Sequence, residues 1–173
     1  PVMNRPLMEY SVELLKEHGF RDIKVTLQYQ PEQIMEHFGD GQKFGVKFHY
    51  YIEDHPLGTA GSVKNVSGLD ETFIVVSGDA LTDFNLTQAV EFHRLQGAAA
   101  TLVLTAVNNP LEYGVVLIDD QGKIKRFLEK PGWSEVFSDT VNTGIYILEP
   151  EVLDLIKPGE VVDFSKDLFP EML

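Results

Sequence analysis

Residues 72–79 read TFIVVSGD, an apolar run that ends in a short polar turn. An uncharged run of this kind is typical of a strand that is buried on both faces of a parallel sheet. The polar turn Ser77-Gly78-Asp79 follows at the carboxyl end of that strand, which is where open α/β sheets bind their ligands. This stretch therefore predicts both a fold class and the place of a candidate site.

Helix-period and strand-like stretches alternate on both sides of this run. Apolar residues at helical spacing, ended by glycine, predict helices over 6–18, 31–38 and 86–95. Runs of β-branched and aromatic residues predict strands over 22–27, 46–52 and 100–107. Strand–helix alternation at this spacing indicates βαβ units. We therefore expect an α/β fold with a Rossmann-like, mostly parallel sheet and flanking helices.

The pattern changes after Pro110. Strands are predicted over 113–118, 124–128 and 143–148 with little helix between them, and short helical stretches over 58–66, 150–156 and 164–173. This succession favours a mixed or antiparallel edge of the sheet. No linker or repeat divides the chain, so we expect a single domain over residues 1–173.

Composition narrows the function classes. The chain has 173 residues, a formal net charge of −13 and no cysteine, which excludes disulfides, a cysteine nucleophile and thiolate metal sites. The acidic balance argues against nucleic acids and anionic membranes as partners. No apolar run approaches the about 20 residues of a membrane span, and we expect a cytoplasmic protein. The five histidines show no metal-ligand spacing and are expected at the surface or in satisfied core positions.

Gly78 and Asp79 form the first candidate site. A carboxylate beside a glycine at a strand end suits an oxygen-preferring cation such as Mg²⁺ next to a phosphate. The alternative is a turn in which Asp79 or Asp83 caps the helix that begins near Leu86. We expect Asp83 to be the cap and Asp79 to be the metal ligand.

Gly58, Thr59 and Gly61 belong to the second candidate, PLGTAGS at residues 56–62. Free N–H groups at the start of a short helix there could receive a nucleobase edge or a phosphate. The alternative is a tight structural turn, which general turn statistics favour for this pattern taken alone.

Three polar or glycine-containing strand segments in the second half are further candidates. Glu129 could accept hydrogen bonds from hydroxyl groups and Lys130 could reach a phosphate, with an exposed strand end before a proline turn as the alternative. Asn142, Thr143 and a glycine interrupt an otherwise apolar strand, which marks either the close approach of a ligand or a bulge. Gly114 has the same two interpretations.

The order of these segments resembles that of the sugar-1-phosphate nucleotidyltransferases. The resemblance rests on PVMNRPLMEY, PLGTAGSV, VVSGDALTDFNL, EYGVV, FLEKP, VNTGIYILEP and DFSKDLFP, which span nearly the whole chain. Within the family, DFSKDLFP, FHRLQGAAATL and LGTAGSV look most like the bacterial mannose-1-phosphate guanylyltransferases. The resemblance implies the fold of the nucleotide-diphospho-sugar transferases.

It also implies a reaction in which a nucleotidyl group passes from a nucleoside triphosphate, here GTP, to a sugar-1-phosphate, here mannose-1-phosphate. The products are an NDP-sugar and pyrophosphate. Asp79 matches the family's catalytic, Mg²⁺-binding aspartate, with Gly78 beside it in the nucleotide site. Gly58, Thr59 and Gly61 match the loop that lies against the nucleobase.

The sugar-phosphate side is implied by the same resemblance. Gly114 matches a main-chain contact to the sugar, and Glu129 matches the acid that holds sugar hydroxyls. Lys130 matches a position near the sugar phosphate, and Asn142 and Thr143 match the strand that lines the sugar pocket.

Two family motifs have no match in these 173 residues. The glycine-rich signature loop with its catalytic arginine and lysine would precede PVMNRP, and a second metal-binding aspartate would follow Leu173. We therefore expect a fragment that is itself inactive, taken from an active transferase. Uridylyl or thymidylyl transfer to glucose-1-phosphate, and a non-catalytic regulatory or assembly subunit of the same fold, are the alternatives, and a homo-oligomer stays open.

Overall fold

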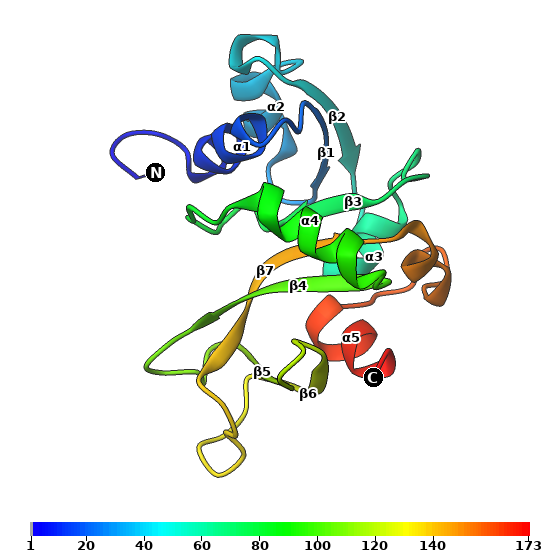
Figure 1. Ribbon diagram of the computed structural model, residues 1–173. Helices are drawn as coiled ribbons and strands as arrows, with labels where there is room; N and C mark the ends of the chain where they lie inside the picture. The colour runs from blue at the N-terminus through cyan, green and yellow to red at the C-terminus, as the bar shows by residue number, and fades with distance from the viewer. Residues whose placement is uncertain (1) are drawn as a thin grey trace.

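The computed structural model describes residues 2–173 (Figure 1). Its helices are α1 (Leu7–Glu17), α2 (Pro31–Phe38), α3 (Gly58–Lys64), α4 (Leu86–Gln96) and α5 (Phe169–Glu171), with shorter helical turns η1 (Gln42–Phe44), η2 (Pro150–Leu155) and η3 (Phe164–Leu168). Its strands are β1 (Asp22–Leu27), β2 (Lys47–Ile52), β3 (Phe73–Val76), β4 (Ala100–Ala106), β5 (Gly114–Ile118), β6 (Ile124–Glu129) and β7 (Thr140–Leu148). The predicted helices and strands agree with these bounds to within three residues at each end.

β1 and β2 form a parallel pair, with Asp22 beside Lys47 at one end and Leu27 beside Ile52 at the other. Helices α1 and α2 lie next to this pair (Figure 1) and share one apolar core with it. The buried members of that core are Val12, Val25, Leu27, Phe38, Val46 and Phe48. Pro31 opens α2 because its fixed φ suits the first helical turn.

The second sheet has five strands, and all its pairs are antiparallel. β7 lies between β3 and β4, and β5 pairs with both β7 and β6. Helix α4 packs against β4 and β7, whereas α3 packs against η2 and η3. In Figure 1, α4 crosses in front of β7 and β4. β7, which carries Asn142 and Thr143, is thus the strand that pairs with three others in this sheet.

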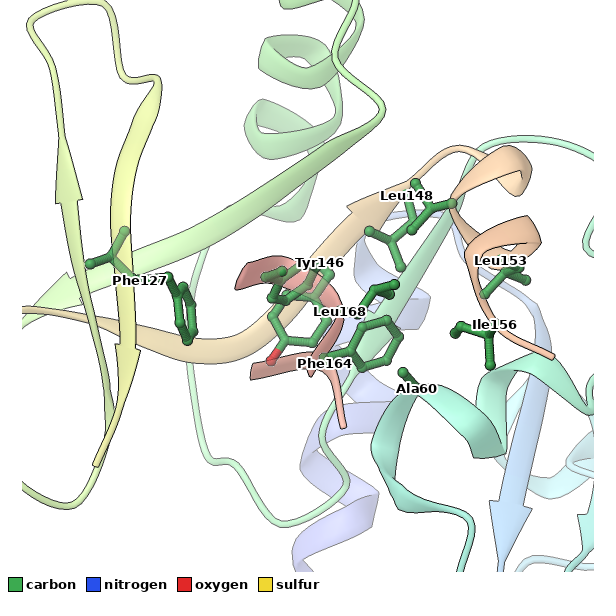
Figure 2. Close-up of a cluster of buried hydrophobic side chains, with 11 residues drawn as sticks. Ala60, Phe127, Tyr146, Leu148, Leu153, Ile156, Phe164 and Leu168 are labelled. Atoms are coloured by element: carbon green, nitrogen blue, oxygen red, sulfur yellow. The ribbon is translucent and has the colours of Figure 1, made fainter. Parts of the chain in front are cut away.

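The main core joins β6 and β7 to α3, η2, η3 and α5. Figure 2 shows Tyr146 of β7 beside Phe164 and Leu168 of η3, with Ala60 of α3 next to Phe164. The ring centroids of Tyr146 and Phe164 are 5.0 Å apart, and Phe164 is 1% exposed. Burying an aromatic side chain of this kind contributes about 2–3 kcal/mol, so η3 is held against β7 by its apolar side chains.

The α/β class, the flanking helices and the antiparallel part are confirmed, but the balance of the pairings differs from the expectation. Among the described residues only β1 and β2 pair in parallel. β3 and β4 run parallel to one another, yet β7 lies between them and pairs antiparallel with each. The expectation of a mostly parallel sheet took successive apolar strands as neighbours, whereas a later strand separates them here.

The burial of β3 also differs from the expectation. A strand covered on both faces was predicted, but all four residues of β3 are half-buried. Within residues 2–173, β3 pairs with β7 alone. A strand at the end of a sheet has one side without a neighbouring strand, which accounts for its partial exposure.

The predicted cap of α4 was wrong. Asn85, and not Asp83, is the N-cap residue: its Oδ1 accepts from the N–H of Gln88 at 3.0 Å. A side-chain oxygen of the residue directly before the helix is the one that reaches the first free N–H groups, and Asp83 lies two residues too early.

His93 confirms the expectation of a satisfied core histidine. It is 1% exposed, and its ring nitrogens bond to Thr101 at 2.8 Å and to Glu149 at 3.0 Å. No helix in the described part of the chain combines the length and the apolar character that crossing a membrane requires.

Candidate functional site

The turn that follows β3 lies against a glycine of β7. The N–H of Ser77 donates to the carbonyl of Gly144 at 3.1 Å, and a Cβ built on Gly144 would come within 2.6 Å of the Ser77 hydroxyl oxygen. Gly144 has a φ of +78°, a conformation that residues with a Cβ rarely adopt. The structure therefore brings the first candidate turn next to the polar interruption in β7.

Gly78 and Asp79 are both exposed on this turn. The N–H of Ala80 donates to the carbonyl of Ser77 at 3.3 Å and closes it. An exposed carboxylate on a closed turn can approach a cation without giving up a buried partner, and carboxylate oxygens are the donors that Mg²⁺ prefers.

The second candidate comprises residues 57–61 and is named here the nucleotide-side loop after the role expected from the sequence. It is packed against the main chain of residues 160–162. A Cβ on Gly58 would come within 2.5 Å of the Val162 carbonyl oxygen, and a Cβ on Gly61 within 2.5 Å of the Glu160 carbonyl oxygen. Gly58 also has a φ of +74°. Both glycines are thus required by a close main-chain approach within the protein itself.

The expectation of free N–H groups in this loop was wrong for two of them. The N–H groups of Ala60 and Gly61 donate to the carbonyl of Val162, at 2.9 and 3.0 Å. The side chain of Thr59 is engaged as well: its hydroxyl donates to Asp163 Oδ2 at 2.9 Å and accepts from the N–H of Phe164 at 2.9 Å. The shape of the loop therefore depends on a segment about a hundred residues away in the sequence.

Gly114 and Glu129 lie opposite each other in the β5–β6 ladder. A Cβ on Gly114 would come within 2.7 Å of Glu129 Oε2 and within 2.7 Å of the Phe127 ring. The pairing is regular at this point, so Gly114 is not a bulge. Its lack of a side chain is what leaves room for the Glu129 carboxyl group.

Glu129 is half-buried. Its burial and the neighbouring Asp163 carboxylate raise the pKa of Glu129 above its ordinary value, and Lys130, Lys166 and the Ser165 hydroxyl oppose that rise only in part. A carboxyl group with a raised pKa can exchange between hydrogen-bond acceptor and donor closer to neutral pH than an exposed one.

Lys130 follows directly and turns the chain away from β6. Its φ is +44°, and its N–H donates to the carbonyl of Tyr113 at 3.0 Å. A left-handed conformation costs a residue with a Cβ about 1–2 kcal/mol. Because such strain persists where the surroundings enforce it and is common at ligand sites, Lys130 remains a candidate for ligand contact.

Both amide hydrogens of Asn142 and one lone pair of its side-chain oxygen are used within the protein. Its Nδ2 donates to the Tyr146 hydroxyl at 2.8 Å and to the Ser165 hydroxyl at 2.9 Å, and its Oδ1 accepts from the N–H of Gly144 at 3.0 Å. Thr143 donates to the carbonyl of Val103 on β4 at 2.7 Å. These bonds fix the two side chains in place around the bend in β7.

The bend is a bulge, which was one of the two interpretations of this stretch. Leu102 pairs with Tyr146 and Leu104 with Asn142, so β7 carries extra residues between these two pairs. Bulges redirect side chains and are common near active sites. Next to this bulge Asn142 bonds to Ser165 of η3, whereas Thr143 bonds to Val103 of β4.

Sequence reasoning missed three residues that complete this arrangement: Tyr146, Asp163 and Ser165. The hydroxyl groups of Tyr146 and Ser165 accept from Asn142, and Ser165 also influences Glu129. Asp163 is the cap of η3: its Oδ1 accepts from the N–H groups of Ser165 and Lys166 at 2.8 and 3.0 Å. Asp163 stands directly before the helical stretch predicted over residues 164–173, and an aspartate at that position is a cap signal in the sequence.

The structure thus groups the predicted residues on two sides. Gly58, Thr59 and Gly61 form one side with residues 160–163. The other is named here the sugar-side cluster after the role expected from the sequence, and it comprises Gly114, Glu129, Asn142, Tyr146 and Ser165. The turn with Asp79 touches β7 at Gly144, two residues from Asn142.

Comparison with known proteins places this arrangement in context. The profile of the family described as "Nucleotidyl transferase" matches residues 1–173. A UTP–glucose-1-phosphate uridylyltransferase from Synechocystis sp. is 44% identical over all of this chain and 48% of its own length. The mannose-1-phosphate guanylyltransferase of Mycobacterium tuberculosis is 33% identical, again over all of this chain and 48% of its own length.

A third relative is the mannose-1-phosphate guanylyltransferase catalytic subunit beta of Drosophila melanogaster, 38% identical over 98% of this chain and 46% of its own. The chain therefore spans about half the length of the curated relatives it matches. Among solved structures, one from Bacillus anthracis, provisionally named a glucose-1-phosphate thymidylyltransferase and crystallised with sucrose, has a TM-score of 0.84 at 27% identity. The superposition covers 95% of this chain and 69% of that one.

Proposed function

Because the chain belongs to the nucleotidyl transferase family, we propose that the protein carrying it transfers a nucleotidyl group from a nucleoside triphosphate to a sugar-1-phosphate. In this reaction a phosphate oxygen of the sugar-1-phosphate attacks the α-phosphorus of the nucleotide. A new P–O bond forms, the bond between the α-phosphorus and the bridging oxygen breaks, and pyrophosphate leaves with the electron pair. Positioning and charge neutralisation dominate such a step.

The observation that carries the proposal is the sugar-side cluster. Glu129 presents a half-buried carboxyl group in a space that Gly114 leaves open. Carboxylates bind vicinal sugar hydroxyls by accepting their hydrogen bonds, and such charge-assisted bonds are stronger than neutral ones. Lys130, at the end of the same strand, carries the cation suited to the phosphate on C1 of the sugar.

Within this cluster Asn142 acts by orientation. Both of its amide hydrogens and one lone pair of its oxygen are used by Tyr146, Ser165 and Gly144. It therefore holds β7 and η3 at a fixed distance and leaves the contact with sugar hydroxyls to Glu129. Gly58, Gly61 and Thr59 in turn shape the nucleotide side, where the N–H groups of Ala60 and Gly61 are already engaged by Val162.

We propose Mg²⁺ as the cofactor, with Asp79 and the adjoining Gly78 turn as its place on this chain. The donor type fits, since Mg²⁺ is commonly held by one or two carboxylates together with substrate phosphates and water. In the described part of the chain no three metal-ligating side chains come together. When bound, Mg²⁺ supplies charge neutralisation on the phosphates.

For the substrates we propose GTP and mannose-1-phosphate, as expected from the resemblance of DFSKDLFP and LGTAGSV to the guanylyltransferases. The 38% and 33% identities with relatives of that name support this choice. UTP with glucose-1-phosphate is the second candidate, which the 44% identity with the Synechocystis relative favours. The cytoplasmic location stays a prediction from the sequence, and a homo-oligomeric state stays open.

Pyrophosphate release from the purified protein that carries this chain tests the proposal. GTP and UTP are each combined with mannose-1-phosphate and glucose-1-phosphate in the presence of Mg²⁺. We expect release with GTP and mannose-1-phosphate, and its loss in Asp79→Asn. Preference for UTP and glucose-1-phosphate would replace the substrate pair, and no release with any of the four combinations would overturn the activity. Glu151→Gln, an exposed glutamate of η2, is the matched control.

A further inference from the structure

Residues 160–168, named here the bridging segment, connect the two sides of the candidate site. The segment runs along α3: the Val162 N–H donates to the Leu57 carbonyl at 2.9 Å, and the Val162 carbonyl accepts from Ala60 and Gly61. It then enters η3, whose Ser165 accepts from Asn142 of β7 at 2.9 Å. One short stretch of chain thus contacts the nucleotide-side loop at its start and the sugar-side cluster at its end.

Asp163 is the residue at which these two contacts meet. Its Oδ2 accepts from the Thr59 hydroxyl of the nucleotide-side loop at 2.9 Å. Its Oδ1 accepts from the N–H groups of Ser165 and Lys166 and so fixes the first turn of η3. Each oxygen of one carboxylate therefore serves a different side of the site.

The apolar side chains make this connection stiff. Phe164 and Leu168 are each 1% exposed, and Phe164 packs on Tyr146 (Figure 2). The N–H of Phe164 donates to the Thr59 hydroxyl at 2.9 Å. Because packed interiors shift as units rather than deform gradually, a displacement of Thr59 is passed to η3 and from there to Asn142.

We propose that Asp163 is a positioning residue that couples occupancy of the nucleotide side to the affinity of the sugar side. This inference rests on the proposed function. A nucleotide bound against residues 57–61 would fix the position of Thr59, which is hydrogen-bonded to Asp163. Asp163 caps the first turn of η3, and Ser165 in that turn is hydrogen-bonded to Asn142. Glu129 is affected too, because the Asp163 carboxylate and the Ser165 hydroxyl both act on it.

A purely structural role for Asp163 makes a different prediction. If the carboxylate only stabilises η3, its removal lowers the stability of the protein and leaves the two ligands independent of one another. The decisive quantity is therefore the ratio of two dissociation constants for the sugar-1-phosphate, with and without nucleotide. That ratio is insensitive to a uniform loss of affinity.

The experiment is isothermal titration of the Mg²⁺-loaded protein with mannose-1-phosphate and with glucose-1-phosphate. Each titration is done with and without the unreactive α,β-methylene analogues of GTP and UTP. We expect the matching analogue to tighten sugar-1-phosphate binding about tenfold in the wild-type protein. In Asp163→Asn and in Thr59→Val we expect a change of less than about twofold.

Asp167→Asn is the matched control. Asp167 accepts from the N–H of Asp163 at 2.8 Å, so it supports the same turn of η3 without bonding to Thr59. It should keep the tenfold effect, and thermal melts of all three variants check that they are folded. Thr59→Val keeps the test available if Asp163→Asn does not fold.

The outcomes separate the inference from the function on which it rests. Retention of the tenfold effect in folded Thr59→Val, or absence of any nucleotide effect in a wild-type protein that binds both ligands, would overturn the coupling and leave the proposed function standing. A wild-type protein that binds neither ligand would overturn the proposed function, and the inference with it.

Discussion

The nucleotide-side loop and the sugar-side cluster are held in different ways. Around Gly58 and Gly61 the contacts are between main-chain atoms, and the space for them exists because two residues lack a side chain. Around Asn142 the contacts are hydrogen bonds between side chains of β7 and η3. A loop built from main-chain contacts tolerates little added volume, whereas a side-chain cluster is sensitive to the loss of a donor or an acceptor. The two regions should therefore fail under different substitutions.

The largest effect is expected from Gly58→Ala. The added Cβ would come within 2.5 Å of the Val162 carbonyl oxygen, and the φ of +74° disfavours any residue but glycine. Overpacking and the left-handed conformation together should lower the free energy of unfolding by about 3 kcal/mol, measured by urea denaturation. Gly159→Ala is the matched control, since its φ is +76° with nothing within 4 Å of the added atom. It should lose about 1 kcal/mol, and equal losses in the two variants would show that the close approach has no energetic weight.

On the sugar side, Glu129→Gln should act mainly on activity. It keeps the shape of the side chain and removes the charge that strengthens hydrogen bonds to sugar hydroxyls. We expect kcat/KM for the sugar-1-phosphate to fall about 100-fold, which corresponds to about 2.7 kcal/mol. The KM for the nucleoside triphosphate should stay within about twofold. Steady-state kinetics with each substrate varied in turn measure both, and an equal change in the two KM values would contradict the separation of the two sides.

Asn142→Ala should lower stability by about 2 kcal/mol. It leaves the hydroxyl groups of Tyr146 and Ser165 without their donor and the N–H of Gly144 without its acceptor, and unsatisfied groups in a partly buried place are costly. Urea denaturation gives the value. A loss smaller than the one expected for Asn85→Ala, an exposed helix cap, would mean that water replaces all three bonds. The hydrogen bonds between side chains of this cluster would then contribute little to the free energy of unfolding.

Asn85→Ala is the exposed helix-cap variant used as the reference, and it should lower the free energy of unfolding by about 1 kcal/mol. Asn85 caps α4 through the N–H of Gln88, whereas Asp83→Ala should change stability by less than about 0.5 kcal/mol. Both are measured by the same denaturation. If Asp83→Ala proved the more damaging of the two, the cap assignment would be wrong.

The incorrect prediction that Asp83 caps α4 shows which structural features can be predicted from a sequence and which cannot. Helix and strand positions follow from local periodicity and from glycine and proline, so β1 and α2 were predicted to the residue. Asp83 and Asn85 are only two residues apart, and either could cap a helix that begins near Leu86. The local sequence pattern does not place the first residue of the helix accurately enough to choose between them. The insertion of β7 between β3 and β4 depends on contacts between distant segments, which no local pattern records.

The same reasoning explains the site residues. Asp79, Glu129 and Asn142 stand at strand ends or interrupt apolar runs, so their residue types mark them out. Asp163 and Thr59 are 104 positions apart, and their bond appears only when α3 and the bridging segment lie together. Of the predicted arrangement, the chemical groups were thus accessible from the sequence, while the connection between the two sides was not.

The smallest effect expected is a change in pH dependence. Burial raises the pKa of Glu129 above its ordinary value of 4.5, so the folded state binds more protons than the unfolded state between 4.5 and the raised pKa. The stability contributed by Glu129 is therefore fully present below pH 4.5, and it is lost as the pH rises from 4.5 through the raised pKa of Glu129. Urea denaturation at several pH values should show wild type losing stability relative to Glu129→Gln as the pH rises.

Glu9 should show the opposite pH dependence of stability in the same measurement. Hydrogen bonds from Arg5 and His37 lower the pKa of Glu9, so its contribution is present above pH 4.5 and lost as the pH falls. On acidification the stability of wild type should therefore fall relative to Glu9→Gln and rise relative to Glu129→Gln. If both differences changed in the same direction, the raised pKa assigned to Glu129 would be wrong. The sugar-side carboxyl group would then be as well solvated as an ordinary surface glutamate, and the strength assigned to its hydrogen bonds with sugar hydroxyls would fall accordingly.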